Sequence, residues 1–241
     1  MRSTKKILAP VIGTLGAGVI IVSGMSHFAG ADNPFSLSQP SSDRSFSSAS
    51  ASDTSAAHVS DVKTLGLIAI NYRLFHLDQL ASNQIAFWIE DEKGHYVKTL
   101  RASSFTAGGG YKMRAEALPE WRKAANWAHA SKSEINQVKL PEQKAGNHTV
   151  YWDCTDAAGK AVKPGTYVYK AEGNIYWQNR VVFTGRITIG KDNAQSTAQA
   201  VYKPSGAKSH GVLLDQVRAG FDSGKSVASV KQDPTTSTQG S

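Results

Sequence analysis

Cysteine is nearly absent from the sequence: Cys154 is the only one in 241 residues. A single cysteine excludes an internal disulfide framework, so the structured part of the chain must be held by a hydrophobic core. Cys154 is then either a chemically unreactive residue or a thiol that forms an intermolecular disulfide bond. A reactive thiol needs a histidine or cationic partner, and His148 lies six residues before it. We expect an inert thiol.

Signatures of catalysis are also missing. The sequence contains no G-x-S-x-G, H-E-x-x-H or G-x-x-x-x-G-K-[ST] pattern. Its seven histidines are scattered without the spacing of metal ligands. The glycine-rich stretch TAGGGYK (106–112) follows no strand-to-helix phosphate pattern and is interpreted as a flexible loop. We therefore expect no catalytic residues, no metal and no cofactor.

The N-terminus has the pattern of a secretory signal peptide, residues 1–31. Three basic residues precede an uncharged, mostly apolar stretch (7–25), and Ala29 and Ala31 stand at positions −3 and −1 of a small-residue cleavage site. The alternative is an uncleaved anchor in the inner membrane, because the apolar stretch approaches the length of a spanning helix. Either way the chain is exported. We expect a periplasmic protein with no nucleic-acid partner and, after cleavage, no stable membrane span.

Composition divides the rest of the chain. Residues 32–60 are rich in Ser, Ala and Asp and poor in large apolar residues, which predicts a disordered tether, and the tail 231–241 has the same character. One domain is expected at 61–192, followed by a partly disordered C-terminal extension at 193–241. The net charge of +8 is spread along the chain without a Lys/Arg block. It favours anionic envelope polymers or membrane surfaces as partners.

Inside the domain, apolar residues recur with a period of two. In QIAFWIED (84–91), Ile85, Phe87 and Ile89 fall on one side of a strand, and the turn EDEKGH leads into YVKTLR (96–101) as a β-hairpin. Further strand candidates are 65–74, 149–152, 166–172 and 180–190. Short antiparallel strands separated by turns predict a mainly β fold, an immunoglobulin-like antiparallel β-sandwich.

One segment departs from this period. In residues 115–131, apolar side chains including Leu118 and Trp121 fall at helical spacing, and Pro119 suits a first helical turn. This predicts a helical insertion of about three turns. Trp121 and Trp127 could form a ligand platform, but we expect them to anchor the insertion to the sheet, because buried aromatic side chains dominate packing.

The stretch VYWDCTDAAGKAVKPGTYVYKAEG (150–173) is predicted to form a turn between two strands. Asp153 and Asp156 can each accept hydrogen bonds from backbone N–H groups just ahead of them, which closes Asx turns. The Gly after DAA supplies a positive φ, and Pro-Gly suits the centre of a type II turn. A calcium loop requires a different spacing of aspartates, so we expect no metal. The predicted turn motif consists of Trp152, Asp153, Asp156, Gly159, Pro164, Gly165 and Tyr167.

These residues carry a resemblance. WDCTDAAGKAVKPGTYVYKAE is similar to the W-D-G-x-D-x-x-G-x-x-V-x-x-G-x-Y block of two kinds of bacterial protein, the immunoglobulin-like domain of flagellar hook-capping proteins and a family of predicted periplasmic proteins, domain of unknown function 2271. IAFWIEDEKGHYVKTL, followed by the Trp-bearing insertion, also resembles that second family. The resemblance covers about 65–190, is fairly specific for the family and says almost nothing about activity. Besides the turn motif it highlights Trp88, Glu90, Asp91, Gly94, Leu100 and Trp121.

The chain departs from the family pattern at two places. Cys154 stands where the block usually has Gly, which we interpret as a position that tolerates a small side chain and has no conformational requirement. Many members carry a D-x-x-[ST]-G-A-T-like segment that is reminiscent of covalent flavin attachment. The corresponding residues here, SKSEINQVKLPEQKAG (131–146), contain no Thr acceptor, so no covalent flavin is expected.

The sequence therefore predicts an exported, non-enzymatic envelope module that binds another envelope protein or an anionic envelope polymer. Its expected contact surface consists of Tyr151, Tyr167 and Tyr169. The alternative function is that of a periplasmic redox accessory protein associated with flavin-dependent electron transfer, which is suggested by the relatives with the flavin-like segment.

Overall fold

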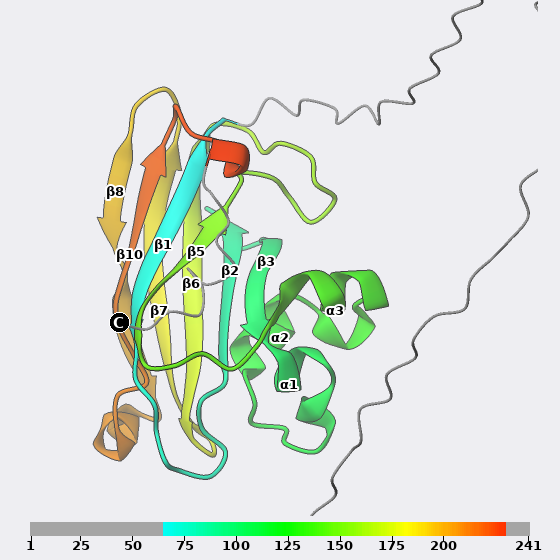
Figure 1. The fold of residues 1–241 in the computed structure, drawn as a ribbon, viewed down its shortest axis with the longest axis vertical. Helices are drawn as coiled ribbons and strands as arrows, with labels where there is room; N and C mark the ends of the chain where they lie inside the picture. Colours follow the sequence, from blue (N-terminus) through cyan, green and yellow to red (C-terminus); the bar gives the residue numbers. More distant parts are fainter. Residues whose placement is uncertain (1–64, 230–241) are drawn as a thin grey trace, which may run out of the picture. The chain divides into compact units, whose positions relative to one another are not determined.

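The computed structural model of the chain describes residues 65–229, which form two β-sheets and a few short helices (Figure 1). The predicted mainly β fold is confirmed. The expected signal peptide (1–31), tether (32–60) and tail (231–241) lie outside the described residues. No helix within the described part is long and apolar enough to cross a bilayer.

The smaller sheet has four antiparallel strands in the order β5-β1-β10-β8. Its strands are β5 (Gly146–Trp152), β1 (Leu67–Leu74), β10 (Leu214–Asp222) and β8 (Ala194–Thr197). The larger sheet has six strands in the order β4-β3-β2-β6-β7-β9, antiparallel except for the β3–β4 pair. Its strands are β4 (Lys139–Leu140), β3 (Tyr96–Ser103), β2 (Ile85–Asp91), β6 (Gly165–Tyr176), β7 (Asn179–Ile189) and β9 (Gln199–Lys203).

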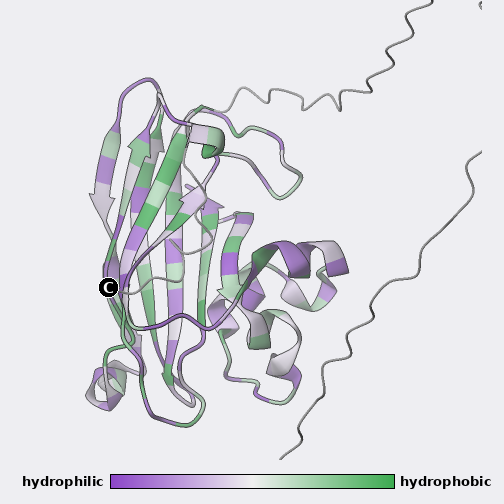
Figure 2. Ribbon diagram, viewed as in Figure 1, coloured by the Kyte–Doolittle hydropathy of each residue, from purple (hydrophilic) through white to green (hydrophobic). Residues whose placement is uncertain are grey.

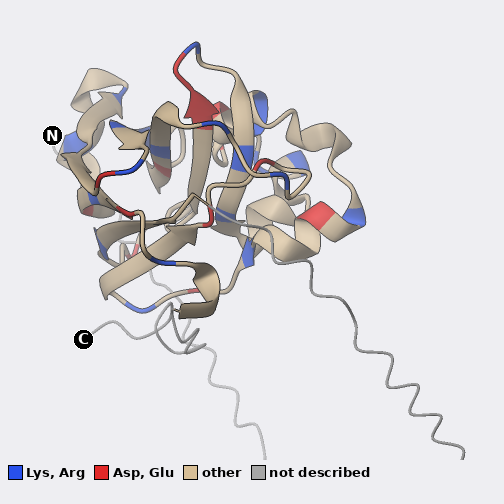
Figure 3. Cartoon of the chain, turned by 90° about the horizontal axis from the view of Figure 1, so that it is seen from above, with Lys and Arg blue, Asp and Glu red and all other residues tan. Residues whose placement is uncertain are grey.

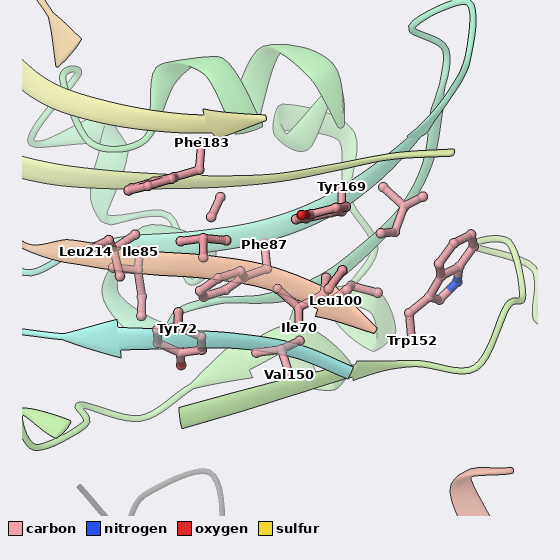
Figure 4. Packing of buried hydrophobic residues seen from close by; sticks show 14 of the residues in the cluster. Ile70, Tyr72, Ile85, Phe87, Leu100, Val150, Trp152, Tyr169, Phe183 and Leu214 are labelled. Atoms are coloured by element: carbon pink, nitrogen blue, oxygen red, sulfur yellow. The ribbon is translucent and has the colours of Figure 1, made fainter. Parts of the chain in front are cut away.

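The main hydrophobic core lies between the two sheets (Figure 4). Alternate residues of each strand point inward, and the same alternation appears as coloured bands along the strands in Figure 2. The rings of Tyr72 on β1 and Phe87 on β2 meet across the core, with centroids 4.5 Å apart. Trp152 at the end of β5 is fully buried in the same core. The sandwich is therefore held by apolar packing and needs no disulfide.

A second hydrophobic cluster joins the helices to the outer face of the larger sheet. The helices are α1 (Ser104–Ala107), α2 (Pro119–Ala124) and α3 (Lys132–Val138). Trp121 and Trp127 are buried here with ring centroids 4.6 Å apart, and their indole N–H groups donate to Thr99 Oγ1 and to the Ala107 carbonyl. The anchoring role expected for the two tryptophans is confirmed, and a ligand platform is excluded because neither ring is accessible.

The insertion is more broken than its spacing predicts. A helix of about three turns was expected over 115–131, but α2 is six residues long. Leu118 before it and Asn126 after it both adopt left-handed backbone, with φ of 49° and 46°. Such residues cannot continue a right-handed helix, so they set its limits.

Residues beyond 192 add three strands to the two sheets. β10 lies between β1 and β8 in the smaller sheet, and β9 forms one edge of the larger sheet. Between β8 and β9, at Ala198, the chain passes from one sheet to the other. Much of the segment expected as a C-terminal extension, up to Asp222, is therefore part of the sandwich.

Candidate binding face

The two aspartates of the predicted turn motif have backbone partners. The Asp156 carboxylate accepts from the N–H groups of Ala158 and Lys160, each at 2.9 Å, and Gly159 between them has a φ of 77°. Asp153 accepts from the Thr155 N–H at 3.2 Å. These are the Asx turns expected from the sequence, and they order the backbone without creating a site.

Two details of the motif differ from expectation. Gly165 is the first residue of β6, paired with Ile189, and its φ of 154° differs from the roughly 80° of a type II turn. Cys154 has a φ of 56°, the left-handed region in which Gly is the least strained residue. The interpretation that this position has no conformational requirement was wrong. Burial raises the pKa of the Cys154 thiol to about 12, which keeps it protonated and unreactive at neutral pH.

The other residues that carry the family resemblance also support the fold. The Trp88 indole donates to Glu90 at 2.8 Å, and Lys170 forms an ion pair with Glu90 at 2.8 Å. Asp91 closes the β2–β3 hairpin by accepting from the backbone of the turn, in which Gly94 has a φ of 84°. The residues of the family pattern thus support the strands and turns of the sandwich, and they do not indicate where a ligand would bind.

Glu172 is the most perturbed carboxylate of the described residues, a feature often found at active sites. It is fully buried on β6 beneath α2, where it accepts from the Trp121 N–H at 2.8 Å and the Glu120 N–H at 3.3 Å. Arg180 Nε lies 3.6 Å from Glu172 Oε1, and the same guanidinium forms an ion pair with Glu120. Glu120 also forms an ion pair with Lys203. Burial raises the pKa of Glu172 to about 7. Its hydrogen bonds go to two backbone N–H groups at the start of α2, so the carboxylate attaches this helix to the larger sheet.

The three tyrosines expected as one contact surface do not form one, because Tyr151 lies on a different sheet from Tyr167 and Tyr169. Tyr169 is fully buried, and its hydroxyl donates to the Ser196 carbonyl at 3.0 Å. Tyr167 packs edge-on against Trp152, with ring centroids 5.2 Å apart. Tyr151 lies on the opposite side of β5 from Trp152, on the outer face of the smaller sheet. Only Tyr151 of the three is positioned for a ligand on that face.

The outer face of the smaller sheet is hollowed at its centre. Tyr151, Ala69, Gly220 and Gln195 lie side by side across the four strands, β5 to β8. The two middle residues have small side chains or none, and a Cβ added at Gly220 would meet no atom within 4 Å. A groove of about 740 Å³ lies over this row, and a second of about 500 Å³ shares Gln195 and Gly220 with it.

The next row of the face is polar. Thr149, Asn71, Arg218 and Thr197 follow one another across the same strands, and Thr149 donates to Asn71 at 2.8 Å. Arg218 is exposed, and its guanidinium makes no hydrogen bond, ion pair or ring contact with other described residues. Each of the other arginines of residues 65–229 has at least one such contact.

Sequence reasoning found Tyr151 and missed the rest of this face. The signal was present in VRAGFD (217–222), where Val217, Ala219 and Phe221 are buried and alternate with Arg218 and Gly220. The face could be assembled only once β10 was placed between β1 and β8. Figure 3 shows basic residues on several strands and loops, so total charge does not single out Arg218.

The chain matches one protein family in comparisons with known proteins. The model of the family Predicted periplasmic protein (DUF2271) matches residues 69–203, more than half of the chain. No curated protein and no solved structure matches it. The match includes most of both sheets and the helical insertion, and the family's description agrees with the export expected from the N-terminus. The chain belongs to the DUF2271 family of predicted periplasmic proteins.

Proposed function

We propose that this protein is a non-catalytic periplasmic module that holds an anionic polymer of the cell envelope on the outer face of its smaller sheet. The observation that carries the proposal is the unpaired guanidinium of Arg218 in an open, polar groove. In this proposal, residues 1–31 export the chain and residues 32–60 tether the module.

The chemistry of the face suits such a ligand. Arg218 offers a permanent positive charge for a carboxylate or phosphate. Asn71, Gln195 and Thr197 offer amide and hydroxyl groups for neutral oxygens, and Tyr151 offers a ring at the rim. A groove whose floor is made of Ala69 and Gly220 admits an extended chain without rearrangement.

The proposal also includes a distant relationship to another bacterial domain and a second kind of partner for the same face. The block around residues 152–167 supports a distant relationship to the immunoglobulin-like domain of flagellar hook-capping proteins. A second envelope protein could use the same face, and it would meet the same side chains. The alternative function is that of a redox accessory protein associated with flavin-dependent electron transfer, and spectroscopy of the purified protein separates it from the binding module.

The Arg218→Gln variant tests the proposal in a pelleting assay with isolated cell-wall sacculi, which are insoluble and carry free carboxylates. We expect the variant to bind at least about tenfold more weakly, because a charge-assisted hydrogen bond contributes roughly 1.5–3 kcal/mol. Added salt should weaken binding of the wild type more than of the variant. The matched control is Arg186→Gln, an exposed arginine on the other sheet that is paired with Glu92.

Equal loss in both arginine variants would mean that only total charge matters, and equal binding by Arg218→Gln and wild type would contradict the proposal. Purified protein is also expected to be colourless. A flavin absorbance that persists through purification would support the redox function instead.

A further inference from the structure

The chain turns at the end of β10 and stays against the smaller sheet. Asp222, the last residue of β10, accepts a hydrogen bond from the Gly224 N–H at 3.0 Å and forms an ion pair with Lys225 at 3.1 Å. One turn of 3-10 helix, η4 (Val227–Ser229), follows and lies beside the start of β1 (Figure 1). The last described residues are therefore fixed at one end of this sheet.

This turn brings the chain to the groove on the outer face. Lys225 and Ser229 line the larger groove of about 740 Å³ at the end where β10 stops. That groove shares Gln195 and Gly220 with the second one, of about 500 Å³, which is lined by Arg218. The two grooves form one path over the sheet, from Ser229 past Gly220 to Arg218. Residues 230–241 continue the chain from the mouth of this path.

The length of the following segment suits the path. Arg218 precedes Asp222 by four residues, which corresponds to about 13 Å along β10. Asp233 follows Ser229 by four residues, so an extended chain also spans about 13 Å between them. Asp233 is the only acidic residue of 230–241. Its carboxylate can therefore reach the Arg218 guanidinium, which has no partner among residues 65–229.

The composition of the segment also suits the face. Apart from Val230 it contains no large apolar residue, and Thr, Ser and Gln make up most of it. Such a segment cannot build a core of its own, but it can be ordered by a surface that supplies partners. The face supplies the amide and hydroxyl groups of Asn71, Gln195 and Thr197. Pro234 lacks a backbone donor, which favours a position across a sheet face over pairing with a sheet edge.

We propose that residues 230–237 fold back over the outer face of the smaller sheet and occupy the groove, with the Asp233 carboxylate on the Arg218 guanidinium. Lys231 stays at the mouth, where Asp222 lines the groove. This inference rests on the proposed function, because the segment occupies the site assigned there to the envelope polymer. The segment is then an internal competitor, and the apparent affinity for the polymer falls with the fraction of molecules whose groove is closed.

Paramagnetic labelling measures the contact in the exported chain (32–241) without any ligand. Cys154 is buried and its thiol stays protonated at neutral pH, so a nitroxide reagent should label only the cysteine introduced by Ser237→Cys. We expect the label to broaden the NMR signals of Gln195 and Gly220 in the groove. The signals of Arg186 on the other sheet should be broadened much less.

Charge variants of the labelled protein identify the ion pair. Asp233→Asn and Arg218→Gln should each reduce the broadening at Gly220, and the double variant should reduce it no further, because both changes remove the same interaction. The matched control is Asp78→Asn, which removes a fully exposed carboxylate from the β1–β2 connection. This control should leave the broadening unchanged.

Sacculus binding measures the competition. Asp233→Asn should bind about two- to fivefold more tightly than the wild type, because loss of an exposed ion pair opens the groove in more molecules. The same substitution in the Arg218→Gln background should give no gain. Asp78→Asn should also give none, which separates release of the groove from the change in net charge.

The inference is wrong if Asp233→Asn leaves the broadening at Gly220 unchanged, or if Asp78→Asn reduces it equally. Broadening that arises only between labelled and unlabelled molecules would also overturn it, because the segment would then occupy a second molecule's groove. The labelling needs no sacculi. Broadening without sacculus binding would contradict the proposed function alone, and sacculus binding that depends on Arg218 without any broadening would contradict this inference alone.

Discussion

Replacing Glu172 by alanine is expected to lower the free energy of unfolding by about 3–5 kcal/mol. The change leaves the backbone N–H groups of Glu120 and Trp121 without their acceptor at the start of α2. It also removes one of the two carboxylates that face Arg180. Unsatisfied buried groups are costly because water cannot replace the lost partner. Urea denaturation at neutral pH measures the effect, and a loss below about 1 kcal/mol would contradict the structural role of this carboxylate.

The same group predicts a dependence on pH. Burial raises the pKa of Glu172 from 4.5 to about 7, so the folded state holds this proton more tightly than the unfolded state. Its contribution to stability is therefore fully present below about pH 4.5 and is lost as the pH rises through 7. Glu172→Gln removes the titration while keeping one acceptor oxygen. The deficit of Glu172→Gln relative to the wild type should accordingly shrink between pH 5 and pH 8, and a deficit that stays constant would show that the pKa is not raised.

The Gly185→Val substitution is expected to cost about 3 kcal/mol or more, because overpacking in a closed core forces its neighbours to move. Gly185 on β7 lies directly opposite Tyr169 on β6. A Cβ at this position would fall 2.2 Å from the Tyr169 ring, and the Tyr169 hydroxyl reaches the Ser196 carbonyl on β8. The valine would therefore displace a side chain that connects the two sheets.

A double-mutant cycle with Tyr169→Ala identifies the cause. If the clash with the ring is responsible, the double variant should be more stable than the sum of the single effects predicts, by about 1–3 kcal/mol. Additive effects would indicate that valine damages β7 by another route. Thermal or urea denaturation of the four proteins supplies the cycle.

The sequence predicted the parts of the fold in which the period of two is unbroken. In β2, Ile85, Phe87 and Ile89 face the core between the sheets, and Trp88 on the other side packs under the helices. β10 was missed because its pairing with β1 is irregular between Asn71 and Arg73, and Gln216 has a φ of 52°. This irregularity confines the regular alternation to residues 217–222, which shortens the signal on which strand prediction depends.

The candidate site was harder to predict than the fold. Tyr167 and Tyr169 follow the same alternation, so they share a face of β6, but both faces of that strand are partly or fully buried. Alternation alone could not show that this face points into the core. Arg218 and Gly220 become neighbours of Asn71 and Ala69 only through pairing across about 150 residues of chain. Such contacts depend on topology, which local sequence patterns do not contain.

The groove on the smaller sheet is proposed as the binding site, and the Gly220→Val variant tests this assignment most directly. Gly220 faces open space, so valine should fill the groove and leave the melting temperature within a few degrees of the wild type. Binding to isolated sacculi, measured by pelleting, should then fall by about tenfold or more, because the side chain occupies the volume that the ligand requires. Full retention of binding by a folded Gly220→Val protein would contradict the account.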